Sequence, residues 1–472
     1  MDAPAPERRG WLATIAPAYL GVFVWFPFLD LLGVDAPGWA GLTGRLLSAA
    51  LAVFCCYGLL YYPSAALGWR SGRRLAVVAA ESFGAAGAEW ITGVLYGLFA
   101  GVLCAVSIYY SVKLTLLGLA SWTLLGPELF EGWKLGPLRF ESPLVLISLG
   151  FWLFIITAAN GLRLMNVIAA LMKVYSPVAL ALLGLIATWT LIGPGAESPA
   201  ASTPTGDASP SPALLDPRVF QLIFGGFAFA GLMGVEWGGA AASRKDVRIG
   251  GWVAILGGGT FAALAALVIS AGDPGFGSQG LDWEIPSGSL RGALFRGVGG
   301  SLGNWAAGAL LLLFGLSSLA PACYASKVFA DRCRGHWSSL RGWTGTLVGY
   351  GLIFAFMAGS LAARLETIFI LAGAAFAPAA GVLAIEAALN RRERREVRPG
   401  WRAPGVAAWV VGVAVGLAPL VRGAPCAPLL GLVQPAALFA FATAAAVYAL
   451  ATLAFAEGPL PAVVGSGVSE ES

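Results

Sequence analysis

Long apolar stretches recur along almost the whole chain, separated by short polar or charged segments. Each is long enough to cross a bilayer, because a spanning helix needs about 20 apolar residues. The predicted spans are 11–33, 41–62, 89–119, 143–159, 163–193, 218–241, 250–271, 302–330, 343–363, 366–389, 404–422 and 431–456. Lipid offers backbone groups no hydrogen-bond partners, so these stretches must form helices. The pattern predicts an all-α polytopic membrane protein with about 12 transmembrane helices.

Composition and motif content narrow the function classes. Of 472 residues, 58% are hydrophobic and 11% are charged, which leaves almost no soluble shell. The sequence contains no nucleophile–base set and no ATP-binding loop, so we expect neither an enzyme nor an ATP-driven pump. Six cysteines without C-x-x-C spacing and one histidine, His336, predict no disulfide framework, metal cluster or resident cofactor. A sodium ion as the coupling cation remains open.

Positive charge predicts the orientation of the spans. If the N-terminus is cytoplasmic, 20 of the 29 Lys and Arg residues fall in cytoplasmic segments, eight fall outside, and Lys113 lies within a span. This bias follows the positive-inside rule. We therefore expect both termini in the cytoplasm and the chain in a bacterial cytoplasmic (inner) membrane. The net charge of +4 reflects topology, so nucleic acid is not an expected partner.

A segment rich in Pro, Ser, Thr and Ala divides the chain. Such a composition cannot build a core, so we expect an exposed linker after the fifth span. Five spans on each side resemble the inverted repeats of secondary transporters. The predicted divisions are a tail at 1–10, a first repeat at 11–193, an extracytoplasmic linker at 194–217, a second repeat at 218–389, a basic cytoplasmic loop at 390–403, two further helices within 404–456 and a cytoplasmic tail at 457–472.

The first helix of each repeat carries residues that weaken helices. Proline removes a backbone donor, and glycine lowers helix propensity by about 1 kcal/mol. These residues are Pro17, Gly21 and Pro27 in the first span, and Gly225, Gly226, Gly231 and Gly234 in the sixth. The pattern predicts that both helices are broken near mid-membrane. The alternative is that the small residues only allow close helix packing.

Four segments resemble the nucleobase–cation symporters, the purine–cytosine permease family, within the amino acid–polyamine–organocation superfamily. They are Ser82–Gly87 (S-F-G-x-x-G), Val235–Trp237 with Ala241–Asp246, Phe369–Arg392 with its Gly373, Pro378, Gly381 and Glu386, and Trp401–Leu417. The resemblance implies a ten-helix inverted-repeat core, two further helices, and uptake of a flat nitrogenous ring driven by sodium or protons. The implied partners are a small solute, a cation and the lipid bilayer. The oligomeric state is not implied.

Two other functions remain open. The segment Phe227–Gly231 also resembles amino acid and amine permeases of the same superfamily. The third possibility is a sensor or orphan protein that keeps the fold without transporting.

The resemblance also implies a cation site. The adjacent hydroxyls of Ser317 and Ser318 match the family's cation ligands on the eighth span, facing backbone carbonyls of the first span. We expect those carbonyls near Ala18 and Gly21. The alternative is that a serine in a membrane helix bonds back to the carbonyl one turn earlier.

The implied substrate positions are mostly aliphatic. They are Val102 and Val106 on the third span, Phe227 on the sixth, and Leu319 and Cys323 on the eighth, with Gly21 on the first. Phe227 keeps the family's aromatic character, whereas the other side chains cannot read a ring's donors and acceptors. Sites that hydrogen-bond a substrate's edge discriminate strongly. Cytosine and uracil are therefore poor candidates, and a small, rather apolar or heterocyclic solute is expected.

Three ionisable residues within spans are candidates for gating or coupling, because charged groups in the bilayer are costly. Asp30 and Lys113 lie toward the outer ends of their spans and are expected to pair, although snorkelling to the surface also explains Lys113. Glu236 lies toward the inner end of the sixth span. We expect either proton coupling there or an ion pair with Arg244 or Lys245.

If Ser318 is a sodium ligand, Ser318→Ala should weaken the sodium response. Loss of one oxygen ligand is expected to cost about 1–3 kcal/mol. The measurement is the sodium-dependent shift in the thermal unfolding of the purified protein. An unchanged response would remove Ser318 from the cation site.

Overall fold

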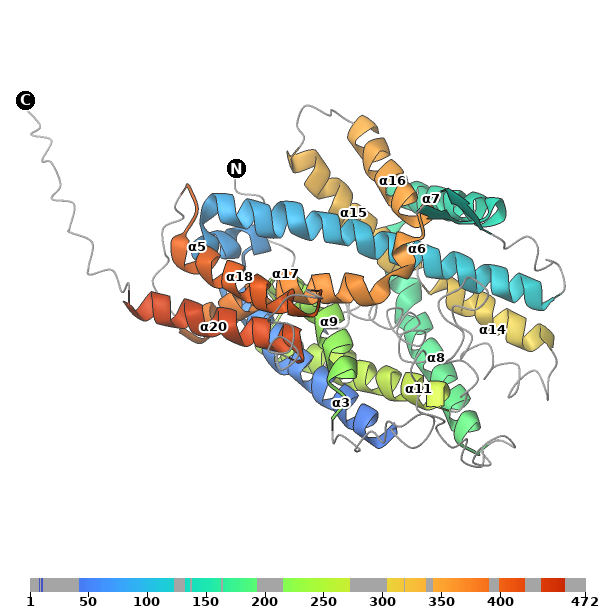
Figure 1. Ribbon diagram of the computed structural model, residues 1–472, viewed down its shortest axis with the longest axis horizontal. Helices are drawn as coiled ribbons and strands as arrows, with labels where there is room; N and C mark the ends of the chain where they lie inside the picture. The colour runs from blue at the N-terminus through green and yellow to red at the C-terminus, as the bar shows by residue number, and fades with distance from the viewer. Residues whose placement is uncertain are drawn as a thin grey trace, which may run out of the picture.

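The computed structural model shows a bundle of long helices with one small β-hairpin (Figure 1). It describes residues 8, 10, 11, 42–122, 132–135, 138–162, 164–192, 215–271, 304–317, 319–336, 343–389, 399–420 and 434–454. The predicted first span, with Ala18, Gly21 and Asp30, lies outside these residues. Ser318 and the predicted linker core at 193–214 do so as well. The predicted divisions of the chain therefore remain predictions.

The described elements follow one another in chain order as helices interrupted by a single hairpin. They are α3 (Leu42–Cys55), η2 (Cys56–Tyr61), α4 (Tyr62–Ser71), α5 (Leu75–Ala88), η3 (Glu89–Leu95), α6 (Tyr96–Ser121), β1 (Trp133–Leu135), β2 (Leu138–Phe140), α7 (Pro143–Gly161), α8 (Met165–Ile192), α9 (Pro217–Ala240), α10 (Arg244–Gly250), η5 (Gly251–Gly258), α11 (Gly259–Ala271), α14 (Asn304–Leu316), α15 (Leu319–His336), α16 (Trp343–Ala358), η8 (Leu361–Ala363), α17 (Leu365–Leu389), α18 (Ala403–Gly416), η9 (Ala418–Leu420) and α20 (Ala436–Ala454). Segments η2, η3 and η5 are π-helical.

Within the described part of the chain, nine helical stretches are long and apolar enough to cross a membrane. They are Leu42–Ser71, Leu75–Ser121, Pro143–Gly161, Pro217–Ala240, Arg244–Ala271, Trp305–Arg332, Leu365–Leu389, Ala403–Leu420 and Ala436–Ala454. Each overlaps one predicted span. The predicted spans 163–193 and 343–363 contain the shorter apolar helices Pro177–Ile192 and Val348–Ala358. The all-α, multi-pass membrane class is confirmed, while the count of twelve stays a prediction.

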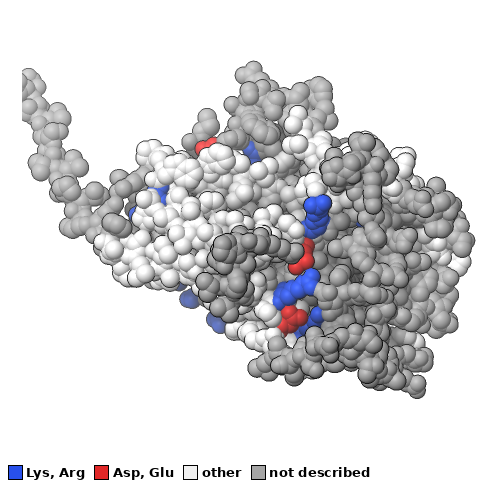
Figure 2. Space-filling model, in the orientation of Figure 1, with Lys and Arg blue, Asp and Glu red and all other residues white. Residues whose placement is uncertain are grey.

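The surface agrees with a lipid environment. Large apolar side chains are exposed, with Ile147 at 72%, Phe154 at 69% and Ile192 at 75% of their full accessibility. On the face in Figure 2 the described surface is almost uncharged, and its few acidic and basic side chains gather mainly in one short row. Exposed apolar area on this scale is costly in water and marks a surface covered by another phase.

Helix α9 corrects one prediction. The sixth span was expected to be broken, yet Pro217–Ala240 is one continuous α-helix. Its glycines serve close packing instead. A Cβ on Gly225 would lie 2.7 Å from the Phe369 carbonyl oxygen, and one on Gly231 would lie 2.7 Å from the Ala380 Cβ. The helix stays continuous because a cost of about 1 kcal/mol per glycine is offset by tight contact with its neighbours.

Helix geometry departs from the regular α form in places that the sequence pattern did not mark. Gly84 in the S-F-G-x-x-G segment has φ 77° and ψ 166°, so α5 kinks there. A Cβ at Gly84 would collide with the Gly400 carbonyl oxygen. Just before the kink, the Phe83 carbonyl accepts a 2.8 Å hydrogen bond from the Arg402 backbone. Two segments that carry the family resemblance therefore meet through close backbone contact.

The signature in α17 also serves packing. A Cβ on Gly373 would lie 2.8 Å from the Ala437 Cβ, and one on Gly381 would lie 2.5 Å from the Phe441 carbonyl oxygen, both in α20. Tyr448 of α20 donates a 2.7 Å hydrogen bond to the buried carboxylate of Glu386. These contacts hold α20 against α17.

The described helices fall into two sets by their contacts. In the first helix set, α3, α4, α9, α17, α18 and α20 pack on one another, and Figure 1 shows α18 and α20 beside α17. In the second helix set, α7, α14, α15 and α16 pack around the long helix α6. Helix α11 joins α8 to α3 at the border.

The approach of α4 to α9 can be tested by Gly68→Ala. A Cβ at Gly68 would collide with backbone atoms of Val235, whereas one at Gly58 meets nothing within 4 Å. Overpacking should lower the free energy of unfolding by about 1–3 kcal/mol for Gly68→Ala. Gly58→Ala should be neutral or stabilising. Thermal unfolding of the two purified variants in detergent is the measurement, and equal midpoints would contradict the packing described.

Candidate transport site

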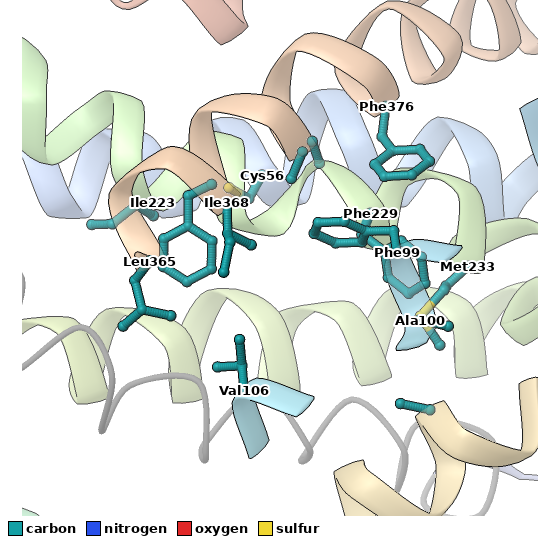
Figure 3. Packing of buried hydrophobic residues seen from close by; sticks show 14 of the residues in the cluster. Cys56, Phe99, Ala100, Val106, Ile223, Phe229, Met233, Leu365, Ile368 and Phe376 are labelled. Atoms are coloured by element: carbon teal, nitrogen blue, oxygen red, sulfur yellow. The ribbon is translucent and has the colours of Figure 1, made fainter. Parts of the chain in front are cut away.

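Four aromatic rings join the two helix sets, and Figure 3 shows three of them, Phe99, Phe229 and Phe376. Tyr96 of α6 stacks on Phe229 of α9 with ring centroids 4.4 Å apart and planes inclined by 12°. Phe99 of α6 lies 5.3 Å from Phe229, and Phe376 of α17 lies 5.5 Å from it. All four rings are buried. Such pairs contribute about 0.5–1.5 kcal/mol each beyond area burial, so this aromatic cluster holds the two sets together.

Sequence reasoning missed this cluster. It assigned the aromatic wall to Phe227, which is half-buried, whereas Phe229 makes the stacked contact two residues later. Two residues along a helix turn a side chain by about 200°, so these rings leave opposite faces of α9. The sequence did show two aromatic residues three positions apart, Tyr96 and Phe99. It did not show that α9 is the helix that packs against them.

An ion pair lies beside the aromatic cluster, toward the end predicted to be cytoplasmic. Arg332 of α15 places Nη2 3.6 Å from Oε1 of Glu236 on α9. The same guanidinium lies 5.8 Å from the centroid of the Tyr96 ring. The expected partners of Glu236 were wrong: Arg244 donates a 3.2 Å hydrogen bond to the Tyr62 hydroxyl instead. Arg244 follows the turn after α9, whereas Arg332 reaches Glu236 from a helix packed on α6.

The implied substrate positions lie in one continuous apolar cluster. Val106 and Cys323 belong to its buried part, and Val102, Phe227 and Leu319 pack against it half-buried. This cluster extends through most of the described core, from Ala49 to Tyr448. Contact of the implied side chains with a solute stays a prediction.

One polar side chain near these positions was not predicted. Asn160 at the end of α7 donates a 2.8 Å hydrogen bond to the Ser326 hydroxyl and a 3.4 Å bond to the Cys323 carbonyl. Its Oδ1 is buried without a hydrogen-bond partner among the described residues. Asn160 is therefore one amide near the predicted site with a spare acceptor. An asparagine within an apolar run was the available sequence signal.

Hydroxyl groups from three helices gather where α14 ends. Ser317 donates to the Phe314 carbonyl at 2.5 Å, which is the bond back along the helix given above as the alternative. Ser111 of α6 donates to the Gly315 carbonyl at 2.5 Å. Tyr175 of α8 donates to the Leu313 carbonyl at 2.7 Å. Each of these hydroxyls is thus engaged with a carbonyl of α14. The sodium role of Ser317 stays a prediction.

Lys113 does not snorkel. Its side chain is buried, and Nζ lies 4.1 Å from the centroid of the Tyr109 ring. Tyr109 in turn donates a 2.7 Å hydrogen bond to the carboxylate of Glu141, the residue before the N-cap of α7. Because Asp30 lies outside the described residues, the predicted Asp30–Lys113 pair stays a prediction. The sequence did not predict that Lys113 lies on the Tyr109 ring or that Tyr109 is hydrogen-bonded to Glu141.

Comparison with known proteins shows the fold. No family model and no curated protein matches the chain. Among solved structures, the nucleobase-cation-symport-1 family transporter Mhp1, closed with bromovinylhydantoin bound, matches with a TM-score of 0.59 at 18% identity, covering 96% of this chain and 95% of that chain. Its inward-facing conformation matches with a TM-score of 0.57 at 16% identity, with the same coverage. A manganese transporter from Eremococcus coleocola matches with a TM-score of 0.51 at 13% identity, covering 94% and 93%.

These neighbours are transporters, and the similarity runs over nearly the full length of each chain. At such low identity it shows that the fold is shared and leaves the substrate undetermined.

The ion pair beside the aromatic cluster can be tested with Glu236→Gln. Both side chains of the pair are about one-third exposed, so its loss should cost about 0.2–1 kcal/mol. The population in which the two helix sets have separated at this end should then rise about 1.4- to 5-fold. The reporter is a cysteine in place of buried Ala100, in a chain without its native cysteines. We expect faster labelling by a membrane-impermeant maleimide applied from the end predicted to be cytoplasmic.

Glu366→Gln is the control for that experiment. It removes the exposed pair between Glu366 and Arg218, which joins α17 and α9 within the first helix set. Equal labelling rates in the parent and both variants would mean that the Glu236–Arg332 pair does not keep the two helix sets together at this end.

Proposed function

We propose that this chain is a secondary active transporter of the nucleobase–cation symporter type, which takes up a small apolar or heterocyclic solute with a cation. The observation that carries the proposal is the buried surface between two helix sets, joined by Tyr96 on α6 and Phe229 on α9. A fold similar over 96% of the chain to a transporter with a hydantoin bound supports it.

The proposed movement separates the two helix sets at one end. Rings with centroids 4.4 Å apart leave no space for a solute between them. Passage therefore requires the Tyr96–Phe229 stack to open and the Glu236–Arg332 pair to part. In the described state both contacts are made, so the proposed route toward the predicted cytoplasmic end is closed.

The unbroken α9 changes the proposed recognition of the solute. A broken helix exposes backbone donors and acceptors at mid-membrane, which can bind a carboxylate or an ion. The middle of α9 has none to offer, because its backbone groups are paired along the helix. Side chains must then recognise the solute, and the implied ones are Val102, Val106, Phe227, Leu319 and Cys323. These favour a flat, apolar molecule and weaken the amino acid permease alternative.

A screen of purified full-length protein tests the proposal. Thermal unfolding is measured with hydantoins, nucleobases, vitamins and amino acids, each with and without sodium. A ligand at 100 times its Kd should stabilise by about 2.7 kcal/mol. We expect stabilisation by an apolar heterocycle. Stabilisation by amino acids alone would favour the permease alternative.

Two variants locate the binding. Phe227→Ala should abolish the shift caused by the heterocycle, because the ring supplies the predicted apolar wall. Phe54→Ala is the matched control, since Phe54 is 57% exposed on the lipid-facing side of α3. Uptake of the same heterocycle into proteoliposomes then separates the alternatives. Binding without uptake would favour a sensor over a transporter.

A further inference from the structure

Three basic side chains are exposed on the short helix α10, at the end of the span Arg244–Ala271 that is predicted to be cytoplasmic. They are Arg244, Lys245 and Arg248. Arg244 donates a 3.2 Å hydrogen bond to the neutral hydroxyl of Tyr62. Lys245 and Arg248 make no ion pair with any residue that the structure describes. This group of three side chains is called the α10 cations below.

The acidic residue of α10 is engaged elsewhere. Asp246 accepts a 2.6 Å hydrogen bond from the Ser243 hydroxyl and a 3.1 Å bond from the Trp11 backbone N–H. Ser243 in turn accepts from the Asp246 backbone N–H and caps the helix. The carboxylate therefore serves the start of the helix. Three positive charges minus one negative charge leave α10 with a net charge of +2.

Positive charge at this end of the spans is expected from topology alone, so the arrangement of the cations has to carry the argument. Other basic residues near this end are paired within the protein. Arg73 lies 2.6 Å from the Glu81 carboxylate, and Arg332 lies 3.6 Å from that of Glu236. The α10 cations differ because their charge stays available at the surface.

Aromatic side chains hold α10 in place. Tyr61 of η2 donates a 3.0 Å hydrogen bond to the carbonyl of Val247, in the middle of α10. A Cβ on Gly251, directly after α10, would collide with the Tyr61 ring. The Tyr57 ring lies between those of Tyr62 and Trp252, with centroids 6.0 and 5.9 Å away. The helix is thus fixed against its neighbours at both ends.

This packing gives the cations defined positions. Arg244 and Arg248 are four residues apart, so they lie on the same face of the helix. The Tyr62 hydroxyl orients the guanidinium of Arg244. Two guanidinium groups on one face match the oxygens of a phosphate, because their planar N–H groups can donate in pairs.

Exposed apolar side chains begin directly beyond the cations. Trp252 follows Arg248 by four residues, about one helical turn, and is 56% exposed. Val253 is exposed beside it. Phe54 of α3, which packs beside η5, is exposed as well. A cationic surface that continues into exposed apolar side chains matches a molecule with a charged head and hydrocarbon chains.

We propose that the α10 cations bind the headgroup of an anionic phospholipid, whose acyl chains lie on Trp252, Val253 and Phe54. The phosphate accepts hydrogen bonds from Arg244 and Arg248, and Lys245 adds positive charge. The occupant is a lipid rather than a free anion because the site continues into apolar surface that faces the membrane. The site is independent of the proposed solute and of its coupling cation.

Native mass spectrometry of the full-length protein in detergent tests the site. The protein is titrated with phosphatidylglycerol or with phosphatidylcholine of the same acyl chains. We expect the first phosphatidylglycerol to bind more tightly than phosphatidylcholine. Each cation near a headgroup contributes about 5-fold in affinity, so Arg244→Gln/Arg248→Gln should bind phosphatidylglycerol about 25-fold more weakly. Its affinity for phosphatidylcholine should not change.

Lys327→Gln/Arg364→Gln is the matched control. It removes the same charge from two exposed positions, one on α15 and one just before α17. It should bind phosphatidylglycerol as the wild type does. Equal weakening in the two double variants would mean that only net charge matters and would overturn the inference. Equal affinity of the wild type for the two lipids would overturn it as well.

Two further measurements test the acyl part of the site without changing any charge. Trp252→Ala should weaken the binding of both lipids, because it removes apolar contact; an unchanged affinity for phosphatidylglycerol overturns the inference. Thermal unfolding of the wild type should be delayed by phosphatidylglycerol and not by the same concentration of glycerol phosphate. Equal stabilisation by glycerol phosphate would identify a site for free anions and overturn the assignment to a lipid.

Discussion

Close backbone contact between helices is the constraint on which the rest of this structure depends. In lipid there is little hydrophobic force between helices, so small residues that allow close approach determine which helices pack together. Gly68 and Gly238 place the backbones of α4 and α9 against each other, since a Cβ at either position would collide with backbone atoms of the other helix. Gly373 and Gly381 do the same between α17 and its neighbours. The first helix set owes its shape to these glycines.

That packing also decides what kind of surface faces the second helix set. Because α9 is continuous, its backbone polar groups are occupied and only its side chains reach the interface. The side chains at the meeting point are aromatic, with Phe229 stacked on Tyr96, and a partly exposed ion pair lies beside them. The rings at this interface are apolar and buried. This agrees with the proposed uptake of a flat, weakly polar molecule.

The polar groups of the second helix set are arranged differently. Ser111, Tyr175 and Ser317 cap the carbonyls at the end of α14, and Tyr109 and Ser360 both bond to Glu141. Buried polar groups in a membrane helix bundle are costly unless they are satisfied. These hydrogen bonds satisfy buried polar groups that would otherwise destabilise the second helix set. The buried hydrogen-bonded groups thus lie in the second helix set, and the apolar surface of α9 lies in the first.

The sequence by itself determined the class of the protein and the approximate position of its spans, because the need to satisfy backbone groups in lipid acts on each stretch separately. Nine of the predicted spans appear as long apolar helices among the described residues. It also identified the segments around Gly84 and Gly373, although not that both serve contact between helices. Only the tertiary structure decided that the glycines of α9 pack rather than break the helix, that Glu236 pairs with Arg332, and that Lys113 is buried beside Tyr109. These outcomes depend on which side chain a neighbouring helix presents, and a single helix does not carry that information in its own sequence.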